Sequence, residues 1–135
     1  MGFAKVIVDA SALLAILFKE PEILNFETIL TESLDDLVMS PVNYLEVCLR
    51  IDRGDMKELS ENLDEVLKRF NIEVTTITAE QAYRAREAYR KFGKGNHEAR
   101  LNLGDCFAYA LAKTRNEPLL FKGDDFRQTD VEAAS

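Results

Sequence analysis

The sequence predicts an α/β fold, in which a small, mainly parallel β-sheet is flanked by helices. Short β-branched runs alternate with helical patterns along the chain, as they do in parallel sheets. The first run, residues 5–9, is apolar on both faces, which is typical of a buried parallel strand. With 135 residues and no repeat, low-complexity segment or linker, the chain predicts one domain over residues 1–135.

The first half of the chain predicts two strands and four helices. Ser40 followed by Pro41 marks a helix start, with serine as the N-cap and proline in the first helical position. A later helix has a continuous apolar face, formed by Met56, Leu59, Leu63, Val66, Leu67 and Phe70. The expected elements are a strand over 5–9, helices over 10–19 and from 21 to about 30, a strand over 37–39, and helices over 41–52 and 55–70.

The second half predicts two further strands and two further helices. Residues 72–77 are rich in Val, Ile and Thr, which favours a third strand. Thr78 is expected to cap a helix that ends at Phe92, with Gln81 completing a capping box. A loop over 93–96, a deeply buried helix over 103–114 and a strand over 118–121 follow, and the tail after residue 129 is expected to fray.

Composition excludes several classes of protein. A chain that is 47% hydrophobic and 30% charged is typical of globular proteins, and no apolar run is long enough to span a bilayer. Residues 1–5 lead directly into a strand without the pattern of a secretory signal, so we expect a cytoplasmic protein without membrane contact. Cys48 and Cys106 lie in apolar helical stretches and are expected to be buried thiols. Two cysteines and one histidine argue against a zinc-finger site.

The charge distribution bears on nucleic-acid binding. A net charge of −7 opposes contact with phosphates, which requires Lys and Arg. However, residues 84–100 carry a local excess of cationic side chains. These are Arg84, Arg86, Arg90, Lys91, Lys94, His97 and Arg100, against Glu87 and Glu98. The stretch is compatible with RNA contact, although a solvated helix face explains Arg84, Arg86 and Arg90 equally well.

Acidic residues follow the first and last predicted strands. Asp9 ends the first strand, and Asp124 and Asp125 come just after the fourth. Because parallel strands end at the same edge of a sheet, where ligands bind, these acids are expected at one edge. Each also has an ordinary alternative role: Asp9 could cap the next helix, and the pair could form a turn after Gly123.

Two further acids interrupt apolar helices. Asp105 lies near the start of the helix over 103–114, where an ionised acid is costly to bury unless it is paired or bound to a metal. Its alternative role is to cap that helix. Glu46 lies among apolar residues of the helix over 41–52, and its alternative is an ion pair with Arg50 one turn later.

Together these acids predict a carboxylate pocket that holds a divalent cation. Several acids in one pocket repel one another and raise each other's pKa. A hard cation relieves this repulsion, and Mg²⁺ or Mn²⁺ prefers such oxygen ligands. A cation in this setting polarises a phosphate and activates a water molecule, which suits phosphoryl chemistry without His or Lys.

Four segments, taken in order, resemble the motifs of the PIN-domain ribonucleases, and more narrowly those of the VapC toxins of toxin–antitoxin pairs. The segments are 8–13, 45–47, 96–112 and 119–131. The resemblance implies a PIN-like three-layer fold with Asp9, Glu46, Asp105 and Asp124 as catalytic residues. It implies metal ligands at Asp9, Asp105 and Asp124, with Asp125 as a further ligand or turn residue, whereas Asp130 is expected to be structural.

The same resemblance implies an activity and partners. It implies Mg²⁺-dependent endonucleolytic cleavage of RNA, with tRNA or rRNA as the substrate and Mn²⁺ as the alternative cofactor. Ser11 is an expected substrate contact, and Lys94 and Arg100 are expected contacts because they belong to the basic stretch over 84–100. A homodimer and a cognate VapB-like antitoxin that covers the carboxylate pocket are the expected partners.

Three other functions compete with this interpretation. A haloacid-dehalogenase-type phosphatase also begins with a strand that ends in Asp, but it needs a second Asp where this chain has Ser11. A phospho-receiver domain needs an acceptor Asp after a middle strand, where this chain has Thr78. A non-catalytic domain that only binds through its acidic pocket is disfavoured by the complete set of acids.

Overall fold

The computed structural model describes residues 5–54 and 57–135. The predicted helix start at Asp55 and the apolar residue Met56 lie outside the described residues, as do residues 1–4. The elements are β1 (Val6–Val8), α1 (Ala10–Leu17), α2 (Ile23–Glu32), β2 (Leu37–Met39), α3 (Pro41–Ile51), α4 (Lys57–Arg69), β3 (Glu73–Val74), α5 (Ala79–Phe92), α6 (Leu103–Arg115), β4 (Leu119–Leu120) and the short 3₁₀ helix η1 (Phe126–Gln128).

The four strands form one parallel sheet in the order β3-β2-β1-β4. The predicted α/β fold with a small parallel sheet is therefore confirmed. The chain adds β2 and β3 on one side of β1 and then returns to place β4 on its other side. The strand order reverses between β1 and β4, and in parallel sheets ligands bind in the crevice beyond the strand ends at such a point.

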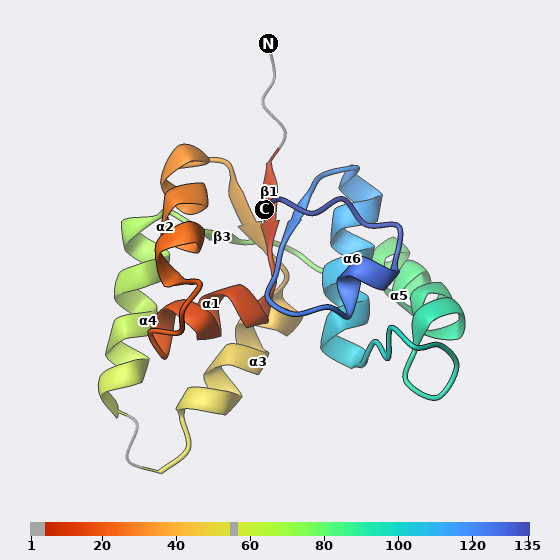
Figure 1. Ribbon diagram of the computed structural model, residues 1–135, viewed down its shortest axis with the longest axis horizontal. Helices are drawn as coiled ribbons and strands as arrows, with labels where there is room; N and C mark the ends of the chain where they lie inside the picture. Colours follow the sequence, from red (N-terminus) through yellow and green to blue (C-terminus); the bar gives the residue numbers. More distant parts are fainter. Residues whose placement is uncertain (1–4, 55–56) are drawn as a thin grey trace.

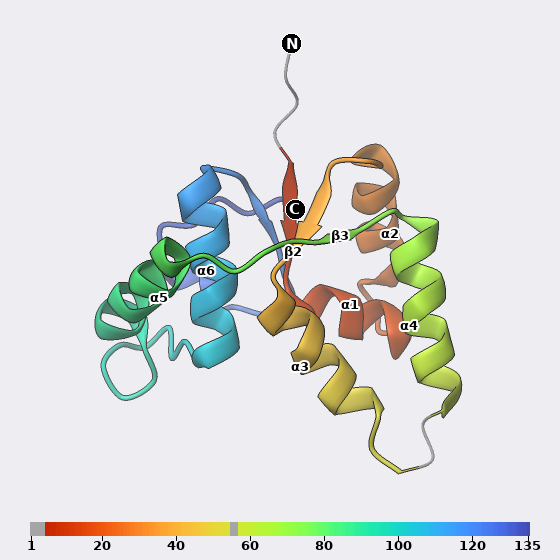
Figure 2. The ribbon, with the colours of Figure 1, turned by 180° about the vertical axis from the view of Figure 1, so that it is seen from behind.

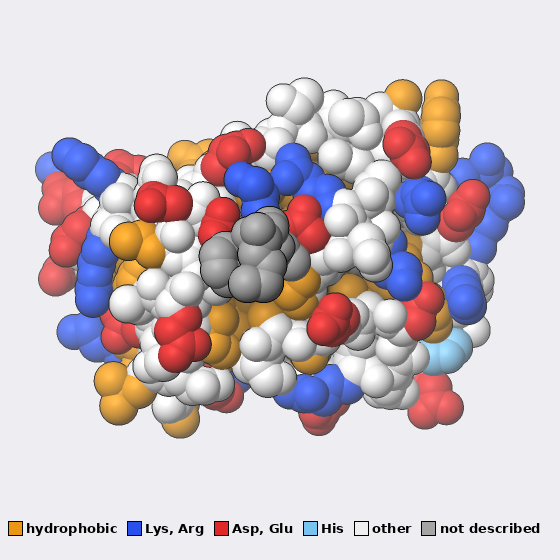
Figure 3. Space-filling view, turned by 90° about the horizontal axis from the view of Figure 1, so that it is seen from above, with side chains coloured by type: hydrophobic (Ala, Val, Ile, Leu, Met, Phe, Trp, Pro, Cys, Tyr) orange, Lys and Arg blue, Asp and Glu red, His pale blue; other side chains and the backbone are white. Residues whose placement is uncertain are grey.

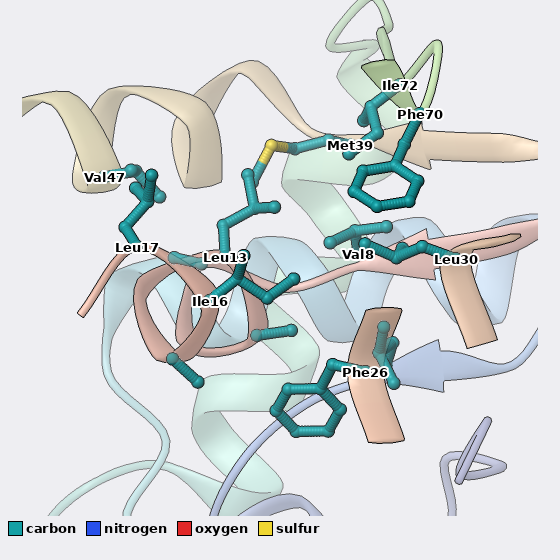
Figure 4. Close-up of a cluster of buried hydrophobic side chains, with 14 of the residues drawn as sticks. Val8, Leu13, Ile16, Leu17, Phe26, Leu30, Met39, Val47, Phe70 and Ile72 are labelled. Atoms are coloured by element: carbon teal, nitrogen blue, oxygen red, sulfur yellow. The ribbon is translucent and has the colours of Figure 1, made fainter. Parts of the chain in front are cut away.

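Helices cover the sheet in two layers. Helices α1 to α4 lie on one side of the sheet, and α5 and α6 lie on the other (Figures 1 and 2). Successive residues of β1 point to opposite layers, so Val8 packs in one apolar cluster and Ile7 in the other. The first cluster brings Val8, Leu13 and Met39 together from three elements (Figure 4). Two-sided burial explains why this strand is apolar throughout.

Polar caps determine where several helices begin. The side chains of Asp9, Ser40 and Thr78 accept hydrogen bonds from backbone N–H groups in the first turns of α1, α3 and α5. The expected capping box at Thr78 forms only in part. The Nε2 atom of Gln81 donates to the carbonyl oxygen of Thr76 (3.3 Å), and its Oε1 atom, which would accept from the backbone N–H of Thr78 in a full box, has no donor among the described residues.

The third strand is shorter than predicted. It covers Glu73–Val74 instead of residues 72–77, and both side chains are exposed. Its neighbour β2 is only three residues long, so the pairing ends soon after the backbone N–H of Thr75 donates to the carbonyl of Met39 (2.9 Å). A β-branched composition alone does not reveal the length of the partner strand.

The C-terminal tail is ordered, so the expectation that it frays is wrong. Ala133 pairs in parallel with Leu119, and the backbone N–H of Leu119 donates to Glu132 (2.8 Å). Asp130 secures this segment by accepting a hydrogen bond from the Tyr109 hydroxyl (2.5 Å) and pairing with Lys113 (3.2 Å). These contacts show the structural role of Asp130.

Neither the described helices nor the two thiols suggest a membrane span or a disulfide. None of the described helices combines the length and apolarity needed to cross a membrane. Cys106 is a buried free thiol, as predicted, and burial raises its pKa to about 11, whereas Cys48 is half-buried.

Figure 3 shows the end of the molecule where the strands begin, and there acidic and basic side chains intermingle without a large patch of one sign.

Candidate functional site

Four carboxylates from separate elements meet beyond the carboxyl ends of the strands. Asp9 follows β1, Glu46 lies on α3, Asp105 lies in the first turn of α6 and Asp125 follows β4. Their charges act on one another. Burial is the main cause that raises the pKa of Asp9, Glu46 and Asp105. Neighbouring charges add to it: Glu46 acts on Asp9, Asp105 acts on Glu46, and Asp9 and Asp125 act on Asp105. We call this group of four residues the acidic pocket.

Asp9 is the most deeply buried of these acids, with 3% of its surface exposed. Its Oδ2 atom accepts hydrogen bonds from the backbone N–H (3.0 Å) and the hydroxyl (2.6 Å) of Ser11. Its Oδ1 atom is buried and has no donor among the described residues. Burial raises the pKa of Asp9 to about 6, despite the opposing effect of these hydrogen bonds. One carboxylate oxygen is therefore free to bind a cation.

Ser11 connects the first strand to the loop after the last one. Its hydroxyl donates to Asp9 and accepts from the backbone N–H of Lys122 (3.0 Å). The backbone N–H of Asp9 also donates to Leu120 (2.9 Å), so the ends of β1 and β4 are joined twice. The hydroxyl of this predicted substrate contact thus bonds to two groups of the protein, which orients Asp9 and the loop that carries Asp125.

Asp105 both caps its helix and belongs to the acidic pocket. Its Oδ2 atom accepts from the backbone N–H of Asn102 (3.0 Å), and Asn102 in turn accepts from the backbone N–H of Asp105 (2.9 Å). This is a complete capping box. Burial is the main cause that raises the pKa of Asp105 to about 6, followed by the nearby charges of Asp9 and Asp125. Capping and a role in the pocket are therefore compatible.

Glu46 is held by a residue that the sequence interpretation missed. Asn43 is fully buried, and its Nδ2 atom donates to Glu46 Oε1 (2.9 Å) and to the carbonyl oxygen of Gly104 (3.0 Å). Its position three residues before Glu46, on the same helix face, is the signal that could have revealed it. The alternative ion pair of Glu46 with Arg50 does not form, since the guanidinium of Arg50 lies 5.0 Å from the centre of the Phe18 ring.

Gly104 leaves the space that the Glu46 carboxyl occupies. A Cβ atom at this position would overlap the carboxyl group of Glu46. We expect Gly104→Ala to force Glu46 out of the acidic pocket and to lower any activity there by about tenfold or more. Alanine favours helices, so the thermal unfolding midpoint should change little. Parallel activity and unfolding measurements check this, and an alanine variant with full activity would contradict it.

The two acids after β4 lie in different surroundings. Asp125 is close enough to act on the charge of Asp105. Asp124 lines a separate hollow together with Lys122 and Arg127. Lys122 is itself paired there with Glu20 (2.5 Å). Of the two acids, Asp125 is thus the one whose charge acts on Asp105, while Asp124 lies beside Lys122 and Arg127.

The two predicted basic contacts, Lys94 and Arg100, lie in the loop between α5 and α6. Both side chains are exposed. The loop closes on itself where Gly93 pairs with Leu101, and the backbone N–H of Lys94 donates to Leu101 (3.0 Å). It leads directly to Asn102, the cap of the helix that carries Asp105. The loop thus presents two cations near the helix end that belongs to the acidic pocket.

The acidic pocket fits a hard divalent cation bound mainly through water. Over residues 5–54 and 57–135, no three His, Cys, Asp or Glu side chains form a ready-made set of metal ligands. Mg²⁺ commonly binds through only one or two carboxylates and keeps several waters. The unpartnered Oδ1 of Asp9 and the mutual repulsion of the acids suit such a cation.

Comparisons with known proteins agree with one another. The family model described as the PIN domain matches residues 6–132. Ribonuclease VapC42 of Mycobacterium tuberculosis is 43% identical over 129 residues, which cover 95% of this chain and 98% of that protein. Ribonuclease VapC of Mycolicibacterium smegmatis is 46% identical over 129 residues, which cover 94% of this chain and 98% of that protein.

Solved structures with low sequence identity show the same fold. VapC20 of Mycobacterium tuberculosis, described as a sarcin-ricin loop cleaving toxin, has a TM-score of 0.75 at 13% identity, over 94% of this chain and 96% of that one. A toxin–antitoxin complex from Klebsiella pneumoniae has a TM-score of 0.67 at 16% identity, over 93% of each chain.

Proposed function

Because this chain belongs to the PIN-domain family, and within it to the VapC ribonucleases, we propose that it is the endoribonuclease toxin of a toxin–antitoxin pair. The observation that carries the proposal is the acidic pocket. Four carboxylates, supplied by elements far apart in the chain, share one place at the sheet edge where the strand order reverses. Acids whose pKa is raised by burial, with neighbouring acids adding to the effect, are typical of functional sites.

We propose that Asp9, Asp105 and Asp125 hold Mg²⁺, in part through bound water, with Mn²⁺ as the alternative. When bound, the cation supplies positive charge to the phosphate and makes water a better nucleophile. Asp9 offers its free Oδ1 atom, and Asp105 offers the oxygen that its capping bond leaves unused. Glu46 would accept hydrogens from a water that the cation also holds, so it would orient that water for attack and would also affect how tightly the cation is held. Asn43 supports this role because its amide donates a hydrogen bond to Glu46 Oε1, which leaves Glu46 Oε2 without a bond to that amide.

The choice of Asp125 over Asp124 can be tested directly. We expect Asp125→Asn to lower RNA cleavage by about tenfold or more, because it removes the charge that acts on Asp105. Asp124→Asn should cost much less, because Asp124 lies beside Lys122 and Arg127. Rates for the two matched variants on one RNA decide between them, and a larger loss in the Asp124 variant would return that residue to the metal site.

RNA would approach across the loop between α5 and α6. Lys94 and Arg100 are exposed there, and both suit contact with the phosphate backbone. A tRNA or rRNA substrate is the proposal for this chain, supported by the relative VapC20, which is described as cleaving the sarcin-ricin loop. The two cations would offset part of the repulsion between RNA and a chain of net charge −7.

Two protein partners belong to the proposal. A cognate VapB-like antitoxin would cover the acidic pocket, where a guanidinium suits the clustered carboxylates. A second copy of the chain would form a homodimer. Support for a protein interface comes from the apolar groove of about 360 Å³ between α5 and α6, beside Leu103, which is 71% exposed, and Tyr89, which is 45% exposed.

The proposed activity is tested by incubating the purified protein with total tRNA and rRNA. We expect discrete internal cuts with Mg²⁺ or Mn²⁺ and none after EDTA removes the cation. A phosphatase would instead hydrolyse p-nitrophenyl phosphate and leave the RNA whole, and that outcome would refute the proposal. The Ser11 hydroxyl, bonded to Asp9 and Lys122, takes the place of the general acid that such a phosphatase needs.

A further inference from the structure

Asn43 is an unusual residue for the interior of this protein. It lies in the first turn of α3 and has no exposed surface. Its side chain joins two helices, since Nδ2 donates both to Glu46 on its own helix and to the carbonyl oxygen of Gly104 on α6. That carbonyl belongs to the residue just before Asp105. Asn43 therefore contacts the side chain of Glu46 and the backbone next to Asp105, although it is not itself one of the four acids of the pocket.

The orientation of the Asn43 amide follows from its neighbours. Both atoms that face Nδ2 are acceptors, so a flipped amide would set Oδ1 against a carboxylate and a carbonyl oxygen. In the observed orientation, Oδ1 is buried and has no donor among the described residues. An unsatisfied buried acceptor lowers stability, whereas an apolar side chain of similar size would avoid that cost. This cost offsets part of the stability that the two Nδ2 hydrogen bonds contribute, so stability alone gives only a weak reason for asparagine here.

We propose that Asn43 is a positioning residue that holds the Glu46 carboxylate against the start of α6, an inference that rests on the proposed function. Its bond restricts the Glu46 side chain to the space that Gly104 leaves open. Without Asn43, the Glu46 carboxylate is free to swing toward solvent, because the residue is only half-buried. Partners of this kind orient the groups that act on a metal or a substrate.

The test is a double-mutant cycle with wild type, Asn43→Ala, Glu46→Gln and the double variant. If Asn43 acts through Glu46, Asn43→Ala should weaken Mn²⁺ binding by about 10- to 100-fold in the wild-type background. In the Glu46→Gln background, the same change should weaken Mn²⁺ binding by less than about twofold. Calorimetric titration with Mn²⁺ measures all four proteins. Equal losses in the two backgrounds, or no loss in either, would overturn the proposal.

Cleavage kinetics provide a second arm of the test. We expect Asn43→Ala to lower kcat by about 10- to 100-fold while KM stays within about twofold of wild type, because Asn43 is buried away from RNA. Asn71→Ala is the matched control, since Asn71 also donates to a carboxylate, that of Asp35 (3.0 Å), but far from the acidic pocket. This control should keep both kinetic constants. A fall in KM and kcat together for Asn43→Ala would count against positioning.

The test still gives an answer if Asn43→Ala fails to fold or if the wild type fails to cut RNA. If Asn43→Ala unfolds, Asn43→Leu fills the same space without a donor and replaces it in the cycle. If the wild type cuts no RNA, the proposed function fails, yet the Mn²⁺ titration still shows whether Asn43 and Glu46 are coupled. Conversely, if the wild type cuts RNA but Asn43→Ala weakens Mn²⁺ binding equally in both backgrounds, the proposed function stands and the positioning role of Asn43 is refuted.

Discussion

Replacing Asp9 by Asn is expected to lower RNA cleavage on the order of a thousandfold. The amide oxygen of asparagine can still accept the two hydrogen bonds from Ser11, so the start of α1 should survive. What the change removes is the negative charge on the buried oxygen that no donor satisfies. Asp105→Asn should have an effect of similar size, because asparagine can also keep the capping box with Asn102.

A matched control separates charge in the acidic pocket from charge elsewhere. Asp35→Asn changes another carboxylate, which accepts a hydrogen bond from Asn71 on a distant surface. It should cleave RNA at the wild-type rate. Initial rates on one RNA, together with circular dichroism to confirm folding, provide the comparison. Undiminished cleavage by both the Asp9 and Asp105 variants would show that the acidic pocket is not the catalytic site.

The second large expected effect is a dependence of stability on pH and Mg²⁺. The pKa of Asp9 rises from an ordinary value of 3.8 to about 6 in the folded protein, and that of Asp105 does the same. Between these values the folded state binds more protons than the unfolded state, so stability increases as pH falls through 6. In EDTA, the free energy of unfolding should be about 1–2 kcal/mol higher at pH 5 than at pH 7.5.

A cation and protons should compete for the same oxygens. Mg²⁺ binds the folded state, so at about 100 times its dissociation constant it should add about 2.7 kcal/mol at pH 7.5. At pH 5, where Asp9 and Asp105 hold protons, the gain should be smaller. Urea unfolding at the two pH values, with EDTA or Mg²⁺, measures all four quantities. A protein that is less stable at pH 5 than at pH 7.5 in EDTA would contradict this account.

Much of the fold could be predicted from the sequence because its signals are local. Val6, Ile7 and Val8 are β-branched and apolar on both faces, which only a strand buried on two sides requires. Ser40 and Pro41 marked the start of α3 to the residue. The order of the tail was not predictable, because the pairing of Ala133 with Leu119 depends on a neighbour in space that periodicity does not reveal.

The acidic pocket was predictable in type but not in detail. A carboxylate after a buried strand, or inside an apolar helix, indicates unusual chemistry from composition alone, as Asp9 and Asp105 show. Which of Asp124 and Asp125 lies close enough to act on the charge of Asp105 depends on the turn that begins at Gly123, where φ is +102°. Such a backbone conformation is not encoded by the acids themselves. Asn43 was missed because its spacing from Glu46 indicates a bond only once Glu46 is known to point inward, and its second bond, to Gly104, depends on a neighbour in space.

Two hydrogen bonds, Lys122 to Ser11 and Asp9 to Leu120, join the ends of β1 and β4. They determine when during synthesis the proposed catalytic site can form. Ser11 and Lys122 are 111 positions apart, so a growing chain contains Asp9 and Glu46 long before it contains Lys122 and Asp125. A product that stops before residue 119 lacks β4, the anchor of Asp9 and Asp125. Incomplete copies of this proposed toxin would therefore lack nuclease activity, which would arise only in a nearly finished chain.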